Sequence, residues 1–321
     1  MGLLVDGVWQ PEAGSWADSR GRVQRPDSTL RNWITPDGSP GPTGRGGFKA
    51  EAGRYHLYIA RACPWAHRAA IFRELKGLQG MIGLSVTHWL MLENGWTFET
   101  APGVIPDEIN GARRLHQIYV KSEPKFNGRA IVPVLWDKET RRIVNNESAD
   151  IIRMFNSAFD GIGAAPGDYY PAELREEIDA INKRVYDTLN NGVYKAGFAG
   201  AQEAYDEAVV PLFETLDWLE RRLSRSRYLC GERLTEADWR LFTTLLRFDP
   251  VYHTHFKCNL KRLVDYSALW AYTRRLYQHP AVRPTVDFDH IKGHYFQSHR
   301  WINPTGIVPK GPIVHFDAPV E

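Results

Sequence analysis

The chain has 321 residues, 43% of them hydrophobic, and its 40 basic and 38 acidic residues leave a formal net charge of +2. This length predicts about two domains of roughly 150 residues, with enough apolar content for two packed cores. A charge so near zero gives no support for a nucleic-acid or anionic-membrane partner, and no apolar run approaches the ~18 residues of a membrane span.

The cysteines and the N-terminus indicate the compartment. Three cysteines are too few, and odd in number, for a disulfide framework, which favours a reducing cytosol. The run Met1–Asp6 lacks the basic region that precedes the apolar core of a secretory signal. We therefore expect a soluble cytoplasmic protein.

In chain order, residues 1–53 come first, rich in Gly, Pro, Ser and Trp without a sustained period, and they predict an irregular N-terminal extension. From 54 to 160 the pattern alternates between strands and helices, which is typical of an α/β domain. Its expected elements are a strand at 55–60, a helix after Cys63, a strand at 82–90, a polar insertion at 93–127, strands at 130–136 and 142–144, and a helix opening at Glu147–Ser148.

Helical periodicity dominates the second half of the chain. A Gly- and Pro-rich linker at 160–171 leads into an expected all-helical domain at 172–283, and residues 284–321 are expected to form an irregular C-terminal extension. The helical signals are leucines at 212, 216, 219 and 223, a capping box at Thr235–Asp238, and a helix at 267–277 that stops before Pro280.

Cys63 is the most informative residue of the chain. It follows the predicted strand, and Pro64 suits the first position of a helix. The thiol is therefore expected at a helix N-terminus, where the helix dipole lowers a thiol pKa and favours a nucleophilic thiolate. Ala66 stands where a Cys-X-X-Cys motif has its second cysteine, so a disulfide at Cys63 needs an external thiol. We interpret Cys230 and Cys258 as small buried residues.

Other positions admit structural explanations when they are taken alone. Pro133 is consistent with a strand edge, Ser148 with an ordinary N-cap, and Trp96 with a side chain that anchors the insertion. Tyrosines of a helical domain mostly serve packing. The histidines show no zinc-ligand spacing, so no metal site is expected.

Seven short segments carry a family resemblance that spans nearly the whole chain. They are Arg61–Arg68 with Cys-Pro-Trp-Ala, Glu93–Trp96, Val132–Asp137, Asn146–Ser148, Asn191–Phe198, Phe248–Tyr252 and Ile291–Tyr295. With these segments in this order, the chain resembles the glutathione transferase superfamily, and within it the glutathionyl-hydroquinone reductases, also called Xi-class glutathione transferases.

The resemblance implies an α/β thioredoxin-like N-terminal domain plus an all-α C-terminal domain, the glutathione transferase fold, with irregular extensions at both ends. It also implies a homodimer, glutathione as co-substrate and no permanently bound cofactor. In the family, the residue matching Cys63 is the nucleophile, Tyr194 matches a proton donor or acceptor, and Tyr252 and Tyr295 match tyrosines that lower the pKa of the sulfur. The implied glutathione-binding residues are Trp96, Arg129, Ala130, Ile131, Val132, Pro133, Glu147 and Ser148.

Physical chemistry is consistent with these implied roles. A cis-proline at 133 would turn the backbone of Val132 toward glutathione, which would pair with it like a short added strand. N–H groups at the N-terminus of a helix bind a carboxylate, and Glu147 supplies the charge opposite to an ammonium group.

The implied activity is glutathione-dependent reduction of glutathionyl-hydroquinones through a mixed disulfide at Cys63. Two alternatives remain open at this point. One is an omega-like thiol transferase that acts on glutathione-capped proteins and small disulfides. The other is a non-catalytic glutathione-binding protein.

Overall fold

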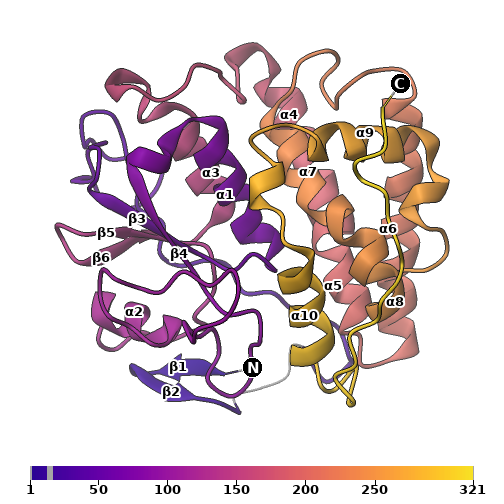
Figure 1. The fold of residues 1–321 in the computed structure, drawn as a ribbon, viewed down its shortest axis with the longest axis horizontal. Coiled ribbons are helices and arrows are strands. Elements are labelled where there is room, and N and C mark those ends of the chain that lie inside the picture. Colours follow the sequence, from indigo (N-terminus) through magenta and orange to yellow (C-terminus); the bar gives the residue numbers. More distant parts are fainter. Residues whose placement is uncertain (1, 13–16, 321) are drawn as a thin grey trace. The chain divides into compact units, whose positions relative to one another are not determined.

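A computed structural model describes residues 2–12 and 17–320, and the chain divides into two compact units. The first unit comprises Met1–Gly14, Asp27–Gly167 and Thr285–Ser298. The second comprises Ser15–Pro26, Asp168–Pro284 and His299–Glu321. Figure 1 labels the elements of both units.

The first unit is built on a four-stranded sheet with the order β4-β3-β5-β6. Its strands are β3 (Tyr55–Ile59), β4 (Ile82–Val86), β5 (Val134–Asp137) and β6 (Arg142–Asn145). β3 pairs parallel with β4 and antiparallel with β5, and every residue of β3 is buried. A central strand covered on both faces is expected to be mostly apolar or aromatic, and the one imidazole of β3, His56, lies 2.8 Å from the Ser85 hydroxyl.

Helices complete this layered arrangement. α1 (Pro64–Leu75) and α3 (Ser148–Ser157) contact each other, and α2 (Leu115–Ser122) contacts β6. Figure 1 shows α1 and α3 side by side. The βαβ unit followed by an antiparallel hairpin and a helix is a thioredoxin-like domain, so the predicted fold of this half is confirmed.

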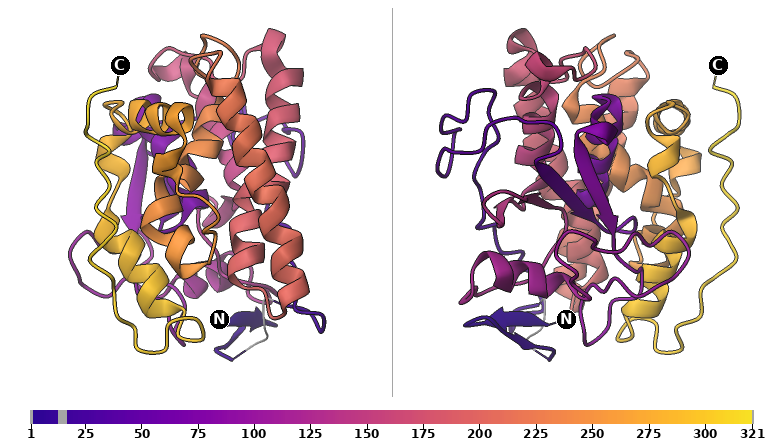
Figure 2. Two further views of the ribbon diagram at one scale, coloured as in Figure 1. Left: turned by 90° about the vertical axis from the view of Figure 1, so that its right-hand side faces the viewer. Right: turned by 60° about the vertical axis from the view of Figure 1, so that its left-hand side comes forward.

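The second unit is helical. It contains α4 (Arg175–Val185), α5 (Gly192–Gly197), α6 (Gln202–Leu223), α7 (Glu236–Arg247), α8 (His253–His255) and α9 (Ser267–Tyr277). Figure 2 shows the long α6 beside its neighbours, and α6 contacts both α5 and α9. Three leucines of the predicted stripe, at 212, 216 and 219, are fully buried. The all-helical prediction is therefore confirmed.

The predicted capping box is present at the start of α7. The Asp238 carboxylate accepts from the Thr235 N–H at 2.8 Å, while the Thr235 side chain bonds the backbone of the first turn. The helix predicted at 267–277 is α9 with the same bounds.

Two predicted strand boundaries were wrong. The strand expected at 82–90 ends at Val86. The Thr87 N–H still donates to the Ile59 carbonyl of β3 at 2.9 Å, but the His88 N–H turns to the Thr97 carbonyl of the insertion at 2.8 Å. The strand expected at 130–136 begins at Val134. Pro133 has no N–H to donate to a ladder, so regular pairing starts after it.

The sequence prediction missed two helices and one hairpin of the described chain. The insertion at 93–127 contains α2, whose buried residues include Leu115, Ile118 and Tyr119 at helical spacing. The N-terminal extension contains a hairpin of β1 (Leu3–Val5) and β2 (Val8–Gln10). The C-terminal extension contains α10 (Phe288–Ser298).

No helix in the described part of the chain is long and apolar enough to cross a membrane.

Candidate active site

Cys63 lies at the N-terminus of α1, at the turn after β3. It is the N-cap residue, with φ −76° and ψ 121°, and Pro64 occupies the first turn of the helix. The Cys63 N–H donates to the Ala60 carbonyl at 3.0 Å, and the side chain is partly exposed. The dipole of α1 therefore acts on an accessible sulfur, which favours the thiolate.

The segment before β5 lies beside this thiol. The Sγ atom of Cys63 donates to the carbonyl oxygen of Val132 at 3.7 Å, and the Val132–Pro133 peptide bond is cis. Val132 and Pro133 are buried, whereas Arg129, Ala130 and Ile131 are partly exposed. Desolvation lowers the pKa of Arg129 from its usual value. The structure thus brings this predicted glutathione-binding segment next to the predicted nucleophile.

A buried tyrosine that the sequence prediction missed joins this segment to the start of α3. The Tyr119 hydroxyl donates to the Ile131 carbonyl at 2.8 Å and accepts from the Asn146 side chain at 3.2 Å. Burial raises the pKa of Tyr119, so its hydroxyl keeps its proton. Tyr119 lies on α2, which was not predicted, and no feature of the sequence around it indicated this role.

Glu147 and Ser148 lie at the N-terminus of α3. The N-cap is Glu147 and not Ser148, because one Glu147 carboxylate oxygen accepts from the Ala149 N–H at 3.0 Å. The other oxygen accepts from the Ser28 hydroxyl at 3.0 Å. Ser148 is the first helical residue and is 2% exposed. A carboxylate is thus held at the positive end of the α3 dipole.

Trp96 is fixed by α10, which belongs to the same unit. Its ring stacks on His294 with 4.7 Å between centroids and an angle of 26°. The His294 Nδ1 atom lies 2.9 Å from the Trp89 carbonyl, so this nitrogen carries the proton and donates. Tyr295, the next residue on α10, is 1% exposed. α10 therefore contributes both Tyr295 and the support for Trp96 to the unit that contains Cys63.

Tyr194 and Tyr252 lie together in the second unit. Their rings meet edge to face with 6.0 Å between centroids. Each is near a π-helical segment, at Tyr186–Asn190 and Phe248–Tyr252, and such segments often occur at functional sites. Tyr252 is fully buried and Tyr194 is partly exposed. Phe256 contacts both rings and was not among the predicted residues.

The other two cysteines are unsuited to nucleophilic chemistry. Cys230 is 7% exposed and Cys258 is 0% exposed. Burial raises the pKa of Cys230 to about 11 and also raises the pKa of Cys258. Both therefore remain protonated near neutral pH.

Among residues 2–12 and 17–320, no three His, Cys, Asp or Glu side chains come together in a way that would hold a metal ion.

A partly exposed thiol at a helix N-terminus, beside a cis-proline on a thioredoxin-like sheet, places the chain in the thioredoxin-like class. Matches to two protein-family models assign the chain to a family within this class. The model of the glutathione S-transferase N-terminal domain matches residues 62–158, and that of the C-terminal domain matches residues 202–275.

Individual relatives extend the similarity over nearly the full length. Glutathionyl-hydroquinone reductase YqjG of Escherichia coli (strain K12) is 56% identical, over 99% of this chain and 98% of that protein. Glutathionyl-hydroquinone reductase PcpF of Sphingobium chlorophenolicum is 55% identical, over 97% of this chain and 96% of that protein. The chain belongs to the glutathione S-transferase family, and within it to the glutathionyl-hydroquinone reductases.

A solved structure supports the same grouping. The glutathione-bound structure of YqjG from Escherichia coli K-12 superposes with a TM-score of 0.93 at 55% identity, covering 99% of this chain and 98% of that one.

Proposed function

We propose that the protein reduces glutathionyl-hydroquinones to hydroquinones at the expense of glutathione. The observation that carries this proposal is Cys63, an accessible thiol at the N-cap of α1 whose sulfur faces the Val132 carbonyl. The full-length similarity to two glutathionyl-hydroquinone reductases supports the choice of substrate.

In the first half of the cycle, the Cys63 thiolate attacks the glutathionyl sulfur of the substrate. A sulfur–sulfur bond forms and the aromatic carbon–sulfur bond breaks. The ring carbon takes the electron pair and a proton, and the hydroquinone leaves. We assign the delivery of this proton to Tyr194. The sulfur atoms are oxidised to a Cys63–glutathione disulfide while the ring is reduced by two electrons.

In the second half, a glutathione thiolate attacks the glutathionyl sulfur of this mixed disulfide. Glutathione disulfide leaves, and the Cys63 thiolate is restored. Ala66 lies buried in the first turn of α1, at the position of the second cysteine of a dithiol motif. An external thiol is therefore required to resolve the mixed disulfide. We assign Tyr252 and Tyr295 the task of stabilising the thiolate, since hydrogen bonds to a charged sulfur favour that form.

Glutathione would bind along the first unit. Its peptide backbone pairs with Val132, next to cis-Pro133 and the segment Arg129–Ile131. Its γ-glutamyl carboxylate meets the start of α3 at Ser148, and its ammonium group meets Glu147. Trp96 contacts the bound peptide. We further propose a cytoplasmic homodimer, as the family resemblance implies.

The test is steady-state turnover of glutathionyl-menadiol or glutathionyl-chlorohydroquinone with glutathione, with products identified by mass. Formation of hydroquinone and glutathione disulfide in equal amounts is the expected result. An omega-like thiol transferase would reduce small glutathione mixed disulfides and leave the aromatic thioether intact. A non-catalytic binding protein would turn over neither substrate.

A further inference from the structure

One stretch of the N-terminal extension, Ser28–Asn32, lies along the outer edge of the sheet in the first unit. The Asn32 N–H donates to the Val144 carbonyl at 2.9 Å, and Asn146 and Leu30 are joined by a backbone hydrogen bond of 3.0 Å. Arg31 pairs antiparallel with Asn145 at the end of β6. The segment Ser28–Asn32 therefore continues the sheet beyond β6 and ends at the corner where α3 begins.

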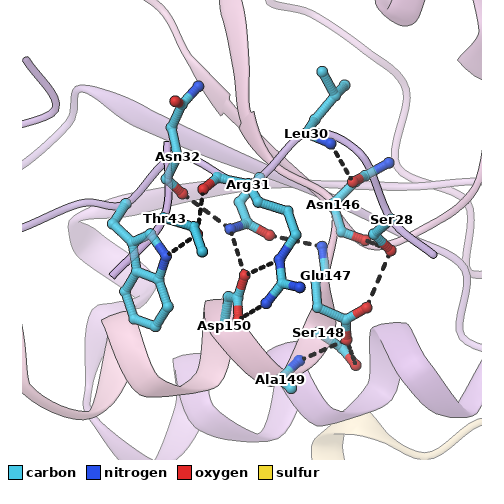
Figure 3. Close-up of polar contacts among 12 residues, drawn as sticks. Ser28, Leu30, Arg31, Asn32, Thr43, Asn146, Glu147, Ser148, Ala149 and Asp150 are labelled. Carbon is cyan, nitrogen blue, oxygen red and sulfur yellow. Dashed lines mark hydrogen bonds and ion pairs between the residues drawn. The ribbon is translucent and has the colours of Figure 1, made fainter. Parts of the chain in front are cut away.

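An ion pair anchors this segment to α3, as Figure 3 shows. The Arg31 guanidinium makes two hydrogen bonds to the Asp150 carboxylate, at 2.7 and 2.6 Å. The Asp150 side chain is only 8% exposed, and it also accepts from Asn145 at 3.2 Å. A bidentate arginine–carboxylate pair fixes orientation as well as distance, so it fixes the segment in register with the first turn of α3.

Ser28 extends from this anchored segment to Glu147. Its hydroxyl lies 3.0 Å from one Glu147 oxygen, the nearer of its two acceptors, and 3.3 Å from the Asn146 carbonyl. The other Glu147 oxygen accepts from the Ala149 N–H at 3.0 Å. The two contacts act on different oxygens of one carboxylate, and they come from different parts of the chain (Figure 3). Together they restrict rotation of the carboxylate about its terminal bond.

We propose that Ser28 is a positioning residue, which holds the Glu147 carboxylate for the ammonium group of glutathione, and that the Arg31–Asp150 pair holds the segment that carries Ser28. This inference rests on the proposed function, in which Glu147 meets that ammonium group. It assigns the N-terminal extension an indirect part, through Glu147, in recognising the γ-glutamyl end of the peptide.

The experiment measures calorimetric affinity for two probes under reducing conditions. One is glutathione, and the other is glutathione that lacks the α-amino group of its glutamyl residue. Ser28→Ala should weaken binding of glutathione roughly 3–10-fold, about the contribution of one ordinary hydrogen bond, and should leave the deaminated probe unchanged. Ser28→Thr keeps a hydroxyl and should restore the affinity for glutathione.

Two further variants separate positioning from general damage to the extension. Thr35→Val removes a side-chain hydrogen bond of 2.8 Å to the Ser39 carbonyl in the same extension, away from Glu147, and should leave both affinities at the wild-type value. Arg31→Met removes the ion pair with Asp150. Like Ser28→Ala, it should weaken binding of glutathione and leave binding of the deaminated probe unchanged. If Arg31→Met has no effect on either probe, the role assigned to the ion pair is wrong.

The outcomes also distinguish this inference from the proposed function. If wild type prefers glutathione to the deaminated probe and Ser28→Ala keeps that preference, the role of Ser28 is overturned and Glu147 is unaffected. If Ser28→Ala weakens binding of both probes equally, the proposal that Ser28 positions the Glu147 carboxylate is also overturned. A wild type without any preference overturns the ammonium contact of Glu147 together with this inference. Absence of hydroquinone reduction by wild type contradicts the proposed function itself.

Discussion

The sulfur of Cys63 and the carbonyl oxygen of Val132 lie 3.7 Å apart, with the thiol as donor. A thiolate has no proton to donate, so ionisation of Cys63 ends this hydrogen bond. The Val132 carbonyl is then left to accept from another donor, and in the proposed binding mode the N–H of glutathione, bound as an added strand, would be that donor. In the proposed function, activation of the nucleophile and backbone pairing of glutathione are therefore coupled through one carbonyl group.

The first prediction concerns the identity of the nucleophile. Cys63→Ala should abolish hydroquinone reduction, whereas Cys230→Ala and Cys258→Ala should retain it, because only Cys63 is both partly exposed and at a helix N-terminus. Mass spectrometry of wild type incubated with a glutathionyl-hydroquinone should find one added glutathione at Cys63, removable by excess glutathione. Turnover that survives in Cys63→Ala would end this assignment.

Local signals in the sequence were sufficient to predict the strand-to-helix turn at Cys63. A buried apolar run followed by Cys-Pro specifies the end of β3 and the N-cap of α1, whatever the rest of the chain does. The same holds for the capping box at Thr235, which depends on residues within one helical turn.

Contacts between distant residues could not be predicted in this way. Ser28 meets Glu147 across 119 positions because its segment pairs with the end of β6, and Trp96 of the insertion stacks on His294 of α10. A periodic pattern in the sequence reports local secondary structure and does not report contacts between residues so far apart. One overlooked signal was local: Asp6 and Gly7 both have positive φ, of 47° and 78°, the Asp-Gly turn of the β1–β2 hairpin.

The second prediction concerns the ionisation of Cys63. Replacing both Tyr252 and Tyr295 by Phe should raise the pKa of the thiol, because two hydroxyl donors to the thiolate are lost. The rate of alkylation by iodoacetamide against pH measures this pKa directly. Tyr228→Phe is a matched control, since it removes a hydroxyl from a residue outside the proposed site. A double variant that titrates like wild type would show that Tyr252 and Tyr295 serve packing alone.

The third prediction concerns stability against pH and centres on His56 of β3. Its Nε2 atom lies 2.8 Å from the Ser85 hydroxyl, which itself donates to the Pro106 carbonyl at 2.9 Å, so His56 is the donor and its other nitrogen carries no proton. Burial lowers the pKa of His56 to about 4, so the folded state keeps a neutral ring. The unfolded chain, with a pKa near 6.5, takes up a proton first.

The stabilisation from neutral His56 is therefore complete above about pH 6.5 and is lost as the pH falls toward 4. As the pH falls from 7.5 to 5, protonation of His56 in the unfolded chain should lower the free energy of unfolding by roughly 2 kcal/mol. Urea unfolding at several pH values measures the slope, and His56→Gln should make it shallower while other titrating groups act equally in both proteins. An unchanged slope in the variant would place the pH dependence elsewhere.

The last prediction separates the two halves of the catalytic cycle through Tyr194. Only cleavage of the aromatic carbon–sulfur bond requires a proton at carbon, because disulfide exchange releases a thiolate that leaves unaided. Tyr194→Phe should therefore slow hydroquinone reduction by roughly 10²–10⁴-fold, the usual contribution of a positioned acid. Its rate of exchange with a small glutathione mixed disulfide should stay near wild type.

Phe198→Leu supplies the control for packing around Tyr194, since the two rings lie 5.8 Å apart between centroids. A change that merely loosens this aromatic cluster should affect both reactions to the same extent. Selective loss in Tyr194→Phe, with no such selectivity in Phe198→Leu, assigns proton transfer to the tyrosine hydroxyl. Tyrosine and phenylalanine at position 194 differ only in the hydroxyl group. Equal losses in the two assays for Tyr194→Phe, or no loss in either, would therefore show that this hydroxyl does not transfer the proton.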